Sequence, residues 1–118
     1  MHDNVSNDRG RQAEADAADF LTAQGLALIS TNFHSRFGEI DLIMRQSDTL
    51  VFVEVKLRTN NSYGDSCELL SISKQRKLIA TAKYYLVSNR CYHTYNCRFD
   101  LVAFNNSKIS WIQNAFYV

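Results

Sequence analysis

The sequence predicts an α/β or α+β domain with a mixed sheet. Segments with helical periodicity and segments with strand-like alternation follow one another in the order α-β-β-β-α-β-β. The chain has 118 residues, of which 46% are hydrophobic and 21% are charged, and these values are typical of one compact globular domain. We therefore expect a flexible polar tail over residues 1–9 and a single domain over residues 10–118.

The first predicted helix covers residues 10–24, and Gly25 is a suitable residue to end it. Its apolar stripe at helical spacing consists of Ala13, Ala17, Phe20 and Leu21. Glu14 lies at the edge of this stripe, so a helix packed on the sheet could direct its carboxylate toward the sheet. The alternative is a glutamate at the rim of a surface helix.

The remaining elements follow from alternation, helical spacing and turn residues. Strands are expected at residues 26–33, in a hairpin at 38–58, and at 97–104 and 108–112, with a loop at 60–65. A second helix is expected at residues 73–88. The residues predicted to line its inner face are Ile72, Ile79, Ala82 and Leu86. Those predicted to face outward are Lys74, Lys77, Thr81 and Tyr84.

The hairpin at 38–58 separates apolar from charged side chains. If its turn is centred between Ser47 and Asp48, alternate residues of the two strands point to opposite faces. The apolar face then pairs Ile40 with Val55, Leu42 with Val53 and Met44 with Val51. The other face pairs Glu39 with Lys56, as an ion pair, and Asp41 with Glu54.

Two opposed carboxylates are unfavourable. Unit charges ~4 Å apart repel by about 1 kcal/mol in water and by about 4 kcal/mol at an effective dielectric constant of 20. Solvent, a shared proton, a nearby cation or a metal ion could offset the repulsion between Asp41 and Glu54. The alternative is a solvated hairpin face whose charges keep the sheet edge soluble. Phe52 and Ile43 share this face, which indicates that it is partly covered.

These charged residues also form a recognisable motif. Asp41, twelve further residues, and then Glu54-Val55-Lys56 have the form D-x12-E-x-K. This motif resembles the acid–acid–lysine signature of the PD-(D/E)XK nuclease superfamily, and the hairpin would place all three side chains on one face.

A longer pattern resembles the YraN-like family of small bacterial proteins. It consists of Asn32, Gly38–Ile43, Phe52–Lys56 with Arg58, Tyr63-Gly64, Arg98–Asp100 and Ala115-Phe116. That family usually has Gly-Glu in its first helix, where this chain has Ala13-Glu14. The resemblance implies a three-layer α/β/α restriction-endonuclease-like domain with a mixed central sheet.

The resemblance also implies roles for the site residues. Asp41 and Glu54 would hold Mg2+ or Mn2+, with the Val55 carbonyl and Glu14 as further ligands. Lys56 would orient the attacking water or stabilise charge on the phosphate. Glu39 would tune Lys56 or join the metal ligands. Asp100 is expected to form an ion pair with Arg98 or Arg58 rather than to bind metal.

Contacts to DNA are expected from a set of basic residues near or beyond this site. They are Arg36, Arg58, Lys74, Arg76, Lys77 and Lys83. His34 lies in the same loop as Arg36 and could also touch a phosphate. The alternative for the helix lysines is an ordinary solvated face, and for His34 and Arg36 a solvated loop.

Three functions remain open at this point. The first is a metal-dependent nuclease acting on DNA, with branched or damaged DNA as substrates to consider. The second is a non-catalytic nucleic-acid-binding protein that retains the fold. The third is a protein-interaction module whose partner surface contains Trp111, Ile112, Phe116 and Tyr117. The net charge of +1 is low for a strong nucleic-acid binder.

Composition limits the setting of the protein. The chain has no apolar run long enough to cross a bilayer and no signal-peptide pattern, so we expect a cytoplasmic protein without membrane contact. Cys67, Cys91 and Cys97 are an odd number without paired spacing, which argues against a disulfide framework and a structural zinc site. A homodimer is compatible with the nuclease hypothesis because junction-type nucleases act as dimers.

Overall fold

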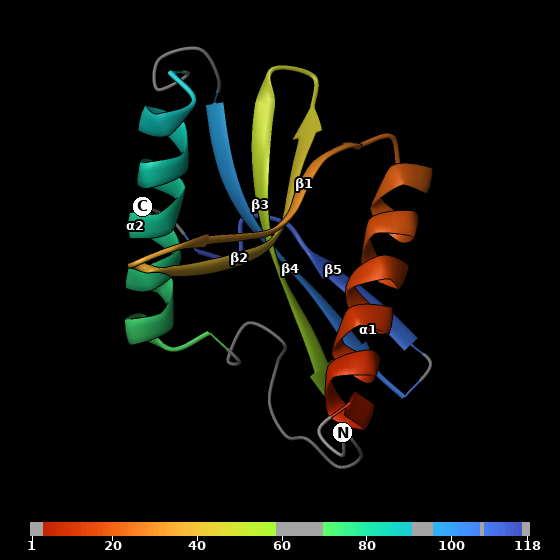
Figure 1. Cartoon of the computed structure of the whole chain (residues 1–118). Coiled ribbons are helices and arrows are strands. Elements are labelled where there is room, and N and C mark those ends of the chain that lie inside the picture. Colours follow the sequence, from red (N-terminus) through yellow and green to blue (C-terminus); the bar gives the residue numbers. More distant parts are fainter. Residues whose placement is uncertain (1–3, 59–69, 91–95, 107, 117–118) are drawn as a thin grey trace.

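Two helices and five strands make up the computed structural model, which describes residues 4–58, 70–90, 96–106 and 108–116 (Figure 1). For residues 4–8 and 58 only the backbone is described. The elements are α1 (Asn4–Ala23), β1 (Ala27–Ser35), β2 (Gly38–Gln46), β3 (Thr49–Arg58), α2 (Ile72–Ser88), β4 (Asn96–Asn105) and β5 (Lys108–Ile112). This order is the predicted one. The loop expected at 60–65 lies outside the described residues, as do Cys67, Cys91 and Tyr117.

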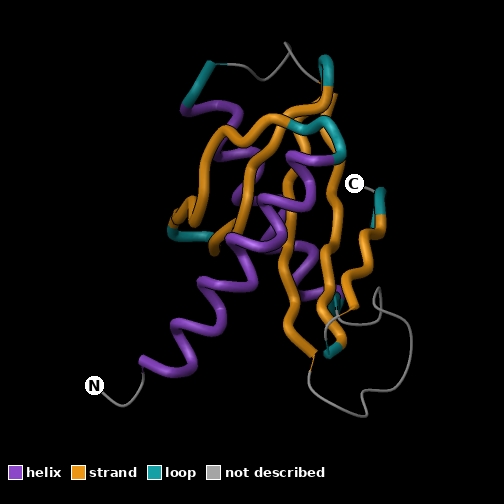
Figure 2. The backbone as a smooth tube through the Cα atoms, turned by 90° about the vertical axis from the view of Figure 1, so that its right-hand side faces the viewer, coloured by secondary structure: helices purple, strands orange, loops and turns teal. Residues whose placement is uncertain are grey.

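The five strands form one mixed sheet in the order β1-β2-β3-β4-β5. β3 and β4 are parallel, and the other neighbours are antiparallel. α1 and α2 cover opposite faces of this sheet, which confirms the three-layer α/β/α arrangement (Figures 1 and 2). The first turns of α1 extend beyond the strands (Figure 2).

Each face of the sheet has its own hydrophobic core. Under α1 the core contains Ala17, Leu21, Leu42, Met44, Val51, Val53 and Val102. Under α2 it contains Ile40, Ile43, Phe52, Leu78, Ala82, Leu86, Phe99 and Leu101. Burial of apolar area on both faces therefore fixes both helices on the sheet.

Trp111, Ile112 and Phe116, near the C-terminal end of the described residues, pack on these cores. Trp111 packs edge-to-face against Phe20 at 6.1 Å between ring centroids, and Phe116 stacks on Phe99 at 4.7 Å. Ile112 packs against the core under α2. A partner surface built on these residues was the basis of the protein-interaction hypothesis, and this packing removes that basis.

Helix α1 begins earlier than the sequence predicted. It starts at Asn4, so residues 4–9 are helical and their assignment to a polar tail is wrong. The segment has no proline, and each residue added to an existing helix gains a hydrogen bond. The predicted stop is confirmed. Gly25 has φ +101°, and the Leu26 N–H donates to the Leu21 carbonyl at 3.1 Å.

Helix α2 begins with a side-chain cap, in which the Lys74 N–H donates to Ser71 Oγ at 3.1 Å. Three residues were assigned to the wrong face of this helix, namely Ile72, Thr81 and Lys74. Ile72 is exposed because it lies in the first turn, and Thr81 is fully buried. The Thr81 hydroxyl donates to the Lys77 carbonyl at 2.8 Å, which satisfies the polar group inside the core.

The register of the β2–β3 hairpin is confirmed between Leu42↔Val53 and Gln46↔Thr49. Beyond Leu42 the ladder to β3 stops, whereas β2 remains paired with β1 as far as Gly38. The β1–β2 hairpin bends away from β3 toward α2 (Figure 1). Ile40 consequently packs under α2, so its predicted place beside Leu42 on the other face is wrong.

Candidate active site

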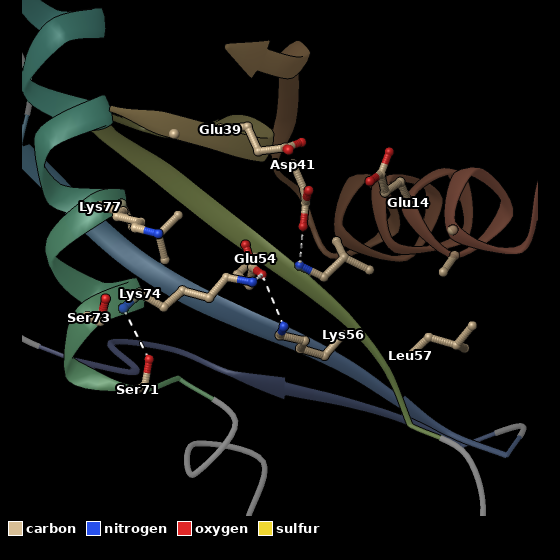
Figure 3. Close-up of a pocket in the computed structure, with 15 residues that line it drawn as sticks. Glu14, Glu39, Asp41, Glu54, Lys56, Leu57, Ser71, Ser73, Lys74 and Lys77 are labelled. Carbon is tan, nitrogen blue, oxygen red and sulfur yellow. Dashed lines mark hydrogen bonds and ion pairs between the residues drawn. The ribbon is translucent and has the colours of Figure 1, made fainter. Parts of the chain in front are cut away.

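A pocket of about 650 Å³ opens where β2 leaves β3, between α1 and α2 (Figure 3). Its charged lining residues are Glu14, Glu39, Asp41, Glu54, Lys56, Lys74 and Lys77. All five residues expected to carry catalysis therefore lie around one cavity. α1 contributes Glu14, and α2 contributes the last two lysines.

Asp41 is held on β2 by the backbone of β3. Its Oδ2 accepts a hydrogen bond from the Val55 N–H at 2.8 Å (Figure 3). Burial raises the pKa of Asp41 to about 7, and the negative charges of Glu54, Glu14 and Glu39 add to this effect against the Val55 hydrogen bond. At neutral pH the Asp41 carboxyl is therefore partly protonated, which marks a local excess of negative charge.

Glu54 is buried, with 6% of its surface exposed, and it is compensated by two lysines. Lys74 Nζ lies 2.6 Å from Glu54 Oε2, and Lys56 Nζ lies 3.6 Å from the same oxygen. A buried carboxylate requires such partners because desolvation is costly. Lys74 was predicted to face outward, and this prediction is wrong because its ammonium group enters the acidic pocket from α2.

The two lysines respond differently to the pocket. Burial lowers the pKa of Lys56, and the neighbouring Lys74 lowers it further, against the opposing effect of Glu54. Burial is the largest effect on Lys74 and disfavours its charged form, but its interactions with Glu54, Lys56 and Asp41 together outweigh burial and raise the pKa of Lys74. Lys56 is thus the lysine whose ammonium group gives up its proton more readily.

The predicted ion pair between Glu39 and Lys56 is wrong. Lys56 contacts Glu54, its neighbour but one on β3, because β2 has already left β3 at the level of Glu39. Glu39 is exposed at the pocket rim, and Glu14 is half-buried on α1. Glu14 therefore lies on the side of α1 that faces the sheet, which is one of the two positions that the sequence allowed.

The oxygen donors of the pocket suit a hard divalent cation. Asp41, Glu54 and the Val55 carbonyl belong to adjoining segments, and Mg2+ and Mn2+ prefer carboxylate and carbonyl oxygens. Burial raises the pKa of Asp41 and the charges of the neighbouring acids raise it further, so a cation bound here would favour the ionised carboxylate. Within the described ranges, however, no three His, Cys, Asp or Glu side chains form a preassembled metal site.

The described residues expected to contact DNA are distributed over three places. Lys74 and Lys77 line the pocket, whereas Arg76 and Lys83 are exposed elsewhere on α2. Arg36 lies at the tip of the β1–β2 hairpin, 4.9 Å from the centroid of the Phe37 ring. The side chain of Arg58 lies outside the described residues.

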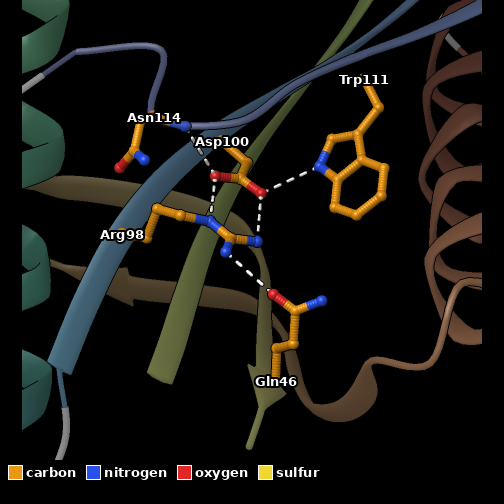
Figure 4. Close-up of polar contacts among 5 residues, drawn as sticks. All are labelled: Gln46, Arg98, Asp100, Trp111 and Asn114. Carbon is orange, nitrogen blue, oxygen red and sulfur yellow. Dashed lines mark hydrogen bonds and ion pairs between the residues drawn. The ribbon is translucent and has the colours of Figure 1, made fainter. Parts of the chain in front are cut away.

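Asp100 takes no part in the pocket. Its carboxylate forms a two-pronged ion pair with Arg98, at 2.9 and 3.0 Å, which confirms one of the two expected partners (Figure 4). Trp111 Nε1 also donates to Asp100 at 2.9 Å, and the Asn114 N–H donates at 3.1 Å. Arg98 in turn donates to Gln46 Oε1 at 2.9 Å. Every contact of this buried group is structural.

The fold and pocket define a three-layer α/β protein with an acid–acid–lysine site between its two helices. The chain belongs to the Uncharacterised protein family UPF0102, whose model matches residues 13–104. This range contains the three residues of the motif together with Glu14 and Lys74, and the membership confirms the resemblance to the YraN-like family.

Relatives match along most of their length. A UPF0102 protein of Francisella tularensis subsp. tularensis is 47% identical over 110 residues, covering 92% of this chain and 94% of the relative. One from Nitrosospira multiformis is 48% identical over 113 residues, covering 93% of each chain. One from Psychromonas ingrahamii is 48% identical over 116 residues, covering 95% and 92%. In the described part of this chain, no helix has the length and apolarity to span a membrane.

Proposed function

We propose that the protein is a metal-dependent phosphodiesterase that acts on DNA through the pocket between α1 and α2. The observation that carries the proposal is the convergence of Asp41, Glu54 and Lys56 in one cavity although the chain separates the first two by a turn and a change of strand. A site that only stabilised the fold would have no use for a carboxyl group whose pKa is raised to about 7 by burial and by neighbouring acids.

Six residues of the pocket would have a role in this reaction. Asp41, Glu54 and the Val55 carbonyl would hold Mg2+ or Mn2+, and Glu14 would support the ion from α1. The bound ion would polarise the phosphate and make a water molecule more acidic. Lys56 would donate a hydrogen bond to charge that develops on the phosphate or to the attacking water. Glu39 lies at the rim of the pocket, where it would influence how the substrate enters.

A second function has one observation in its favour. The Glu54 carboxylate is already neutralised by Lys74 and Lys56, as in a structural ion-pair cluster. A non-catalytic nucleic-acid-binding protein that retains this fold would need no more than such a compensated pocket. The two functions differ in whether Lys56 is needed for cleavage or only for folding.

Replacing Lys56 with alanine tests the nuclease proposal. Wild type and Lys56→Ala would be incubated with Mg2+ or Mn2+ and a panel of single-stranded, duplex, branched and damaged DNA. Cleavage by the variant should be about 100- to 1,000-fold slower, because a donor aimed at developing charge is lost. Affinity for DNA should stay within about threefold, since one phosphate contact among several is a small share of the total.

Glu54→Gln serves as the matched variant, because it keeps the shape of the side chain and removes a metal ligand. It should lose cleavage as well as Mn2+ binding, whereas Lys56→Ala should keep Mn2+ binding. Equal cleavage by Lys56→Ala and wild type would reject the pocket as the catalytic site. Tight DNA binding without cleavage of any substrate by wild type would favour the binding protein.

A further inference from the structure

The tip of the β1–β2 hairpin carries a cluster of aromatic rings that are not closed off from solvent. Phe37 is 38% exposed and Tyr84, on α2, is 47% exposed. The centroid of the Tyr84 ring lies 6.2 Å from the centroids of both Phe37 and Phe33. Phe33 also packs edge-to-face on Tyr85 at 5.1 Å, which anchors the group to the core under α2. We call Phe33, Phe37 and Tyr84 the tip cluster.

The tip cluster borders the acidic pocket. Gly38 follows Phe37 directly and lines the pocket together with Lys77. A methyl group placed on Gly38 would lie 3.4 Å from Thr81 Oγ1 and 3.5 Å from Lys77 Cβ, so the hairpin tip rests closely on α2. Lys77 and Tyr84 are seven residues apart on α2, about 10 Å along the helix, so a ligand with its backbone in the pocket could reach the tip cluster with a unit one or two positions away.

Positive charge accompanies these rings. The Arg36 guanidinium lies 4.9 Å from the centroid of the Phe37 ring, and Arg36 and Lys77 are both exposed. Exposed rings interleaved with cations are the arrangement that binds unpaired nucleotides, because bases stack on aromatic faces while cations contact phosphates. In a duplex the faces of the bases are covered by their neighbours and cannot stack in this way.

We propose that the tip cluster stacks an unpaired nucleobase of the strand whose phosphate enters the acidic pocket. This inference rests on the proposed function for the identity of the ligand and narrows its substrate to nucleic acid with single-stranded character. Phe37 and Tyr84 supply the stacking faces, Arg36 and Lys77 contact the flanking phosphates, and Phe33 positions the rings.

The experiment measures binding in the presence of a chelator, so that cleavage does not interfere. The probes are a fluorescent single-stranded DNA oligonucleotide, the duplex of the same length, and the single strand as RNA, all at one salt concentration. The variants are Phe37→Leu and Tyr84→Leu, which keep apolar bulk without a ring, and Phe37→Tyr, which restores a ring. The control is Ile29→Ala, since Ile29 is 43% exposed near the start of β1, at the end of the hairpin away from its tip.

Each leucine variant should weaken binding of the single strand about 5- to 100-fold and binding of the duplex less than about twofold. Phe37→Tyr and Ile29→Ala should bind as wild type does. If a variant loses the same affinity for single-stranded RNA as for single-stranded DNA, the cluster contacts the base and not the sugar, as proposed. The proposal would be overturned if the leucine variants lost as much affinity for the duplex as for the single strand, or lost no affinity at all. It would also be overturned if the protein bound no nucleic acid, and this outcome would leave a protein partner as the occupant.

The result can be told apart from a failure of the nuclease proposal. If Phe37→Leu loses the single strand selectively while Lys56→Ala cuts as wild type does, the stacking site stands and the catalytic assignment is wrong. If Lys56→Ala loses cleavage while Phe37→Leu binds single strands normally, the catalytic pocket stands and the stacking site is wrong.

Discussion

Asp41 and Glu54 each place a carboxyl group in the same pocket, but the two groups reduce the cost of negative charge there in different ways. Asp41 takes up a proton near neutral pH, because burial and three other acids raise its pKa to about 7. Glu54 instead contacts two lysine ammonium groups, one from its own strand and one from α2. The net charge of the site therefore depends on pH through Asp41 and on which cations contact Glu54.

Asp41→Asn should stabilise the protein at high pH. The pKa of Asp41 is about 7 in the folded protein against an ordinary value of 3.8, so its stabilising effect is complete below about pH 4 and is lost as the pH rises to about 7. Asparagine can still accept the hydrogen bond from Val55 but cannot ionise. One pKa unit corresponds to about 1.4 kcal/mol, so the variant should gain at least about 1 kcal/mol in the free energy of unfolding at pH 8.

Thermal unfolding of both proteins at pH 5 and pH 8 measures this effect. The melting temperature of the variant should exceed that of wild type by about 4 °C at pH 8 and by much less at pH 5. Addition of Mn2+ should raise the melting temperature of wild type and not of the variant, because a ligand of the folded state stabilises by mass action. A variant less stable than wild type at pH 8 would contradict the raised pKa.

Lys74→Met tests whether the lysine from α2 occupies the position of a cation. Without metal, removal of its contact with buried Glu54 should cost about 1–3 kcal/mol in the free energy of unfolding. Saturating Mn2+ should reduce this loss, because the ion then neutralises Glu54. Lys77→Met is the matched control, since Lys77 is an exposed lysine of the same helix, and it should change stability by less than about 0.5 kcal/mol. A loss of the same size with and without Mn2+ would mean that Lys74 does not substitute for metal.

At the scale of the elements, alternation and helical spacing predicted the order of helices and strands and the register of the hairpin near its turn. They could not predict the departure of β2 from β3, because that bend depends on the contact of the hairpin tip with α2. Ile40 was assigned to the wrong face for this reason. The burial of Thr81 was missed because its hydroxyl finds a partner in the carbonyl of its own helix, which composition does not reveal.

The candidate site, like the fold, could be predicted only in part from the sequence. Spacing within one hairpin predicted that Asp41, Glu54 and Lys56 lie near one another, since residues close in sequence determine that geometry. Lys74 and the tip cluster depend on where α2 lies on the sheet. Such contacts between distant segments are tertiary, and no local pattern of a single sequence encodes them.

Replacement by alanine should have opposite effects on the free energy of unfolding at two glycines. Gly38 has φ +149°, a conformation that residues with a side chain rarely adopt, so Gly38→Ala should cost about 1–3 kcal/mol in the free energy of unfolding although a methyl group there would make only ordinary contacts with Thr81 and Lys77. Gly10 lies inside α1 with open space around it, so Gly10→Ala should gain about 0.5–1 kcal/mol. Denaturant unfolding measures both, and a neutral Gly38→Ala would contradict the positive φ of Gly38 at the hairpin tip.

At the scale of the whole molecule, the Arg98–Asp100 pair joins three strands away from the pocket. Arg98 and Asp100 lie on β4, Gln46 ends β2, and Trp111 belongs to β5. The pair thus links β4 to β2 on one side and to β5 on the other. Its role is to hold the strands that carry the pocket and not to take part in the chemistry.

Asp100→Ala should destabilise the protein by about 3–5 kcal/mol, because it leaves a largely buried guanidinium without its carboxylate. The double variant Arg98→Met/Asp100→Leu should recover most of this loss, since two apolar side chains leave no charge unpaired. Urea unfolding compares the three proteins, and Mn2+ binding by the double variant should match wild type. A double variant as unstable as Asp100→Ala would show that the hydrogen bonds to Trp111 and Asn114 matter more than the charge pair.

The parallel pairing of β3 with β4 determines the order in which the chain can assemble. Thr49 pairs with Asn96 and Arg58 with Asn105, so every contact of this ladder waits until α2 and the segments around it have left the ribosome. Until then β3 presents an open edge that includes Val51, Phe52 and Val53, all of them fully or almost fully buried in the finished protein. Long-range strand pairing of this kind folds slowly. The strand that carries Glu54 and Lys56 is therefore the one most exposed to misassociation during synthesis.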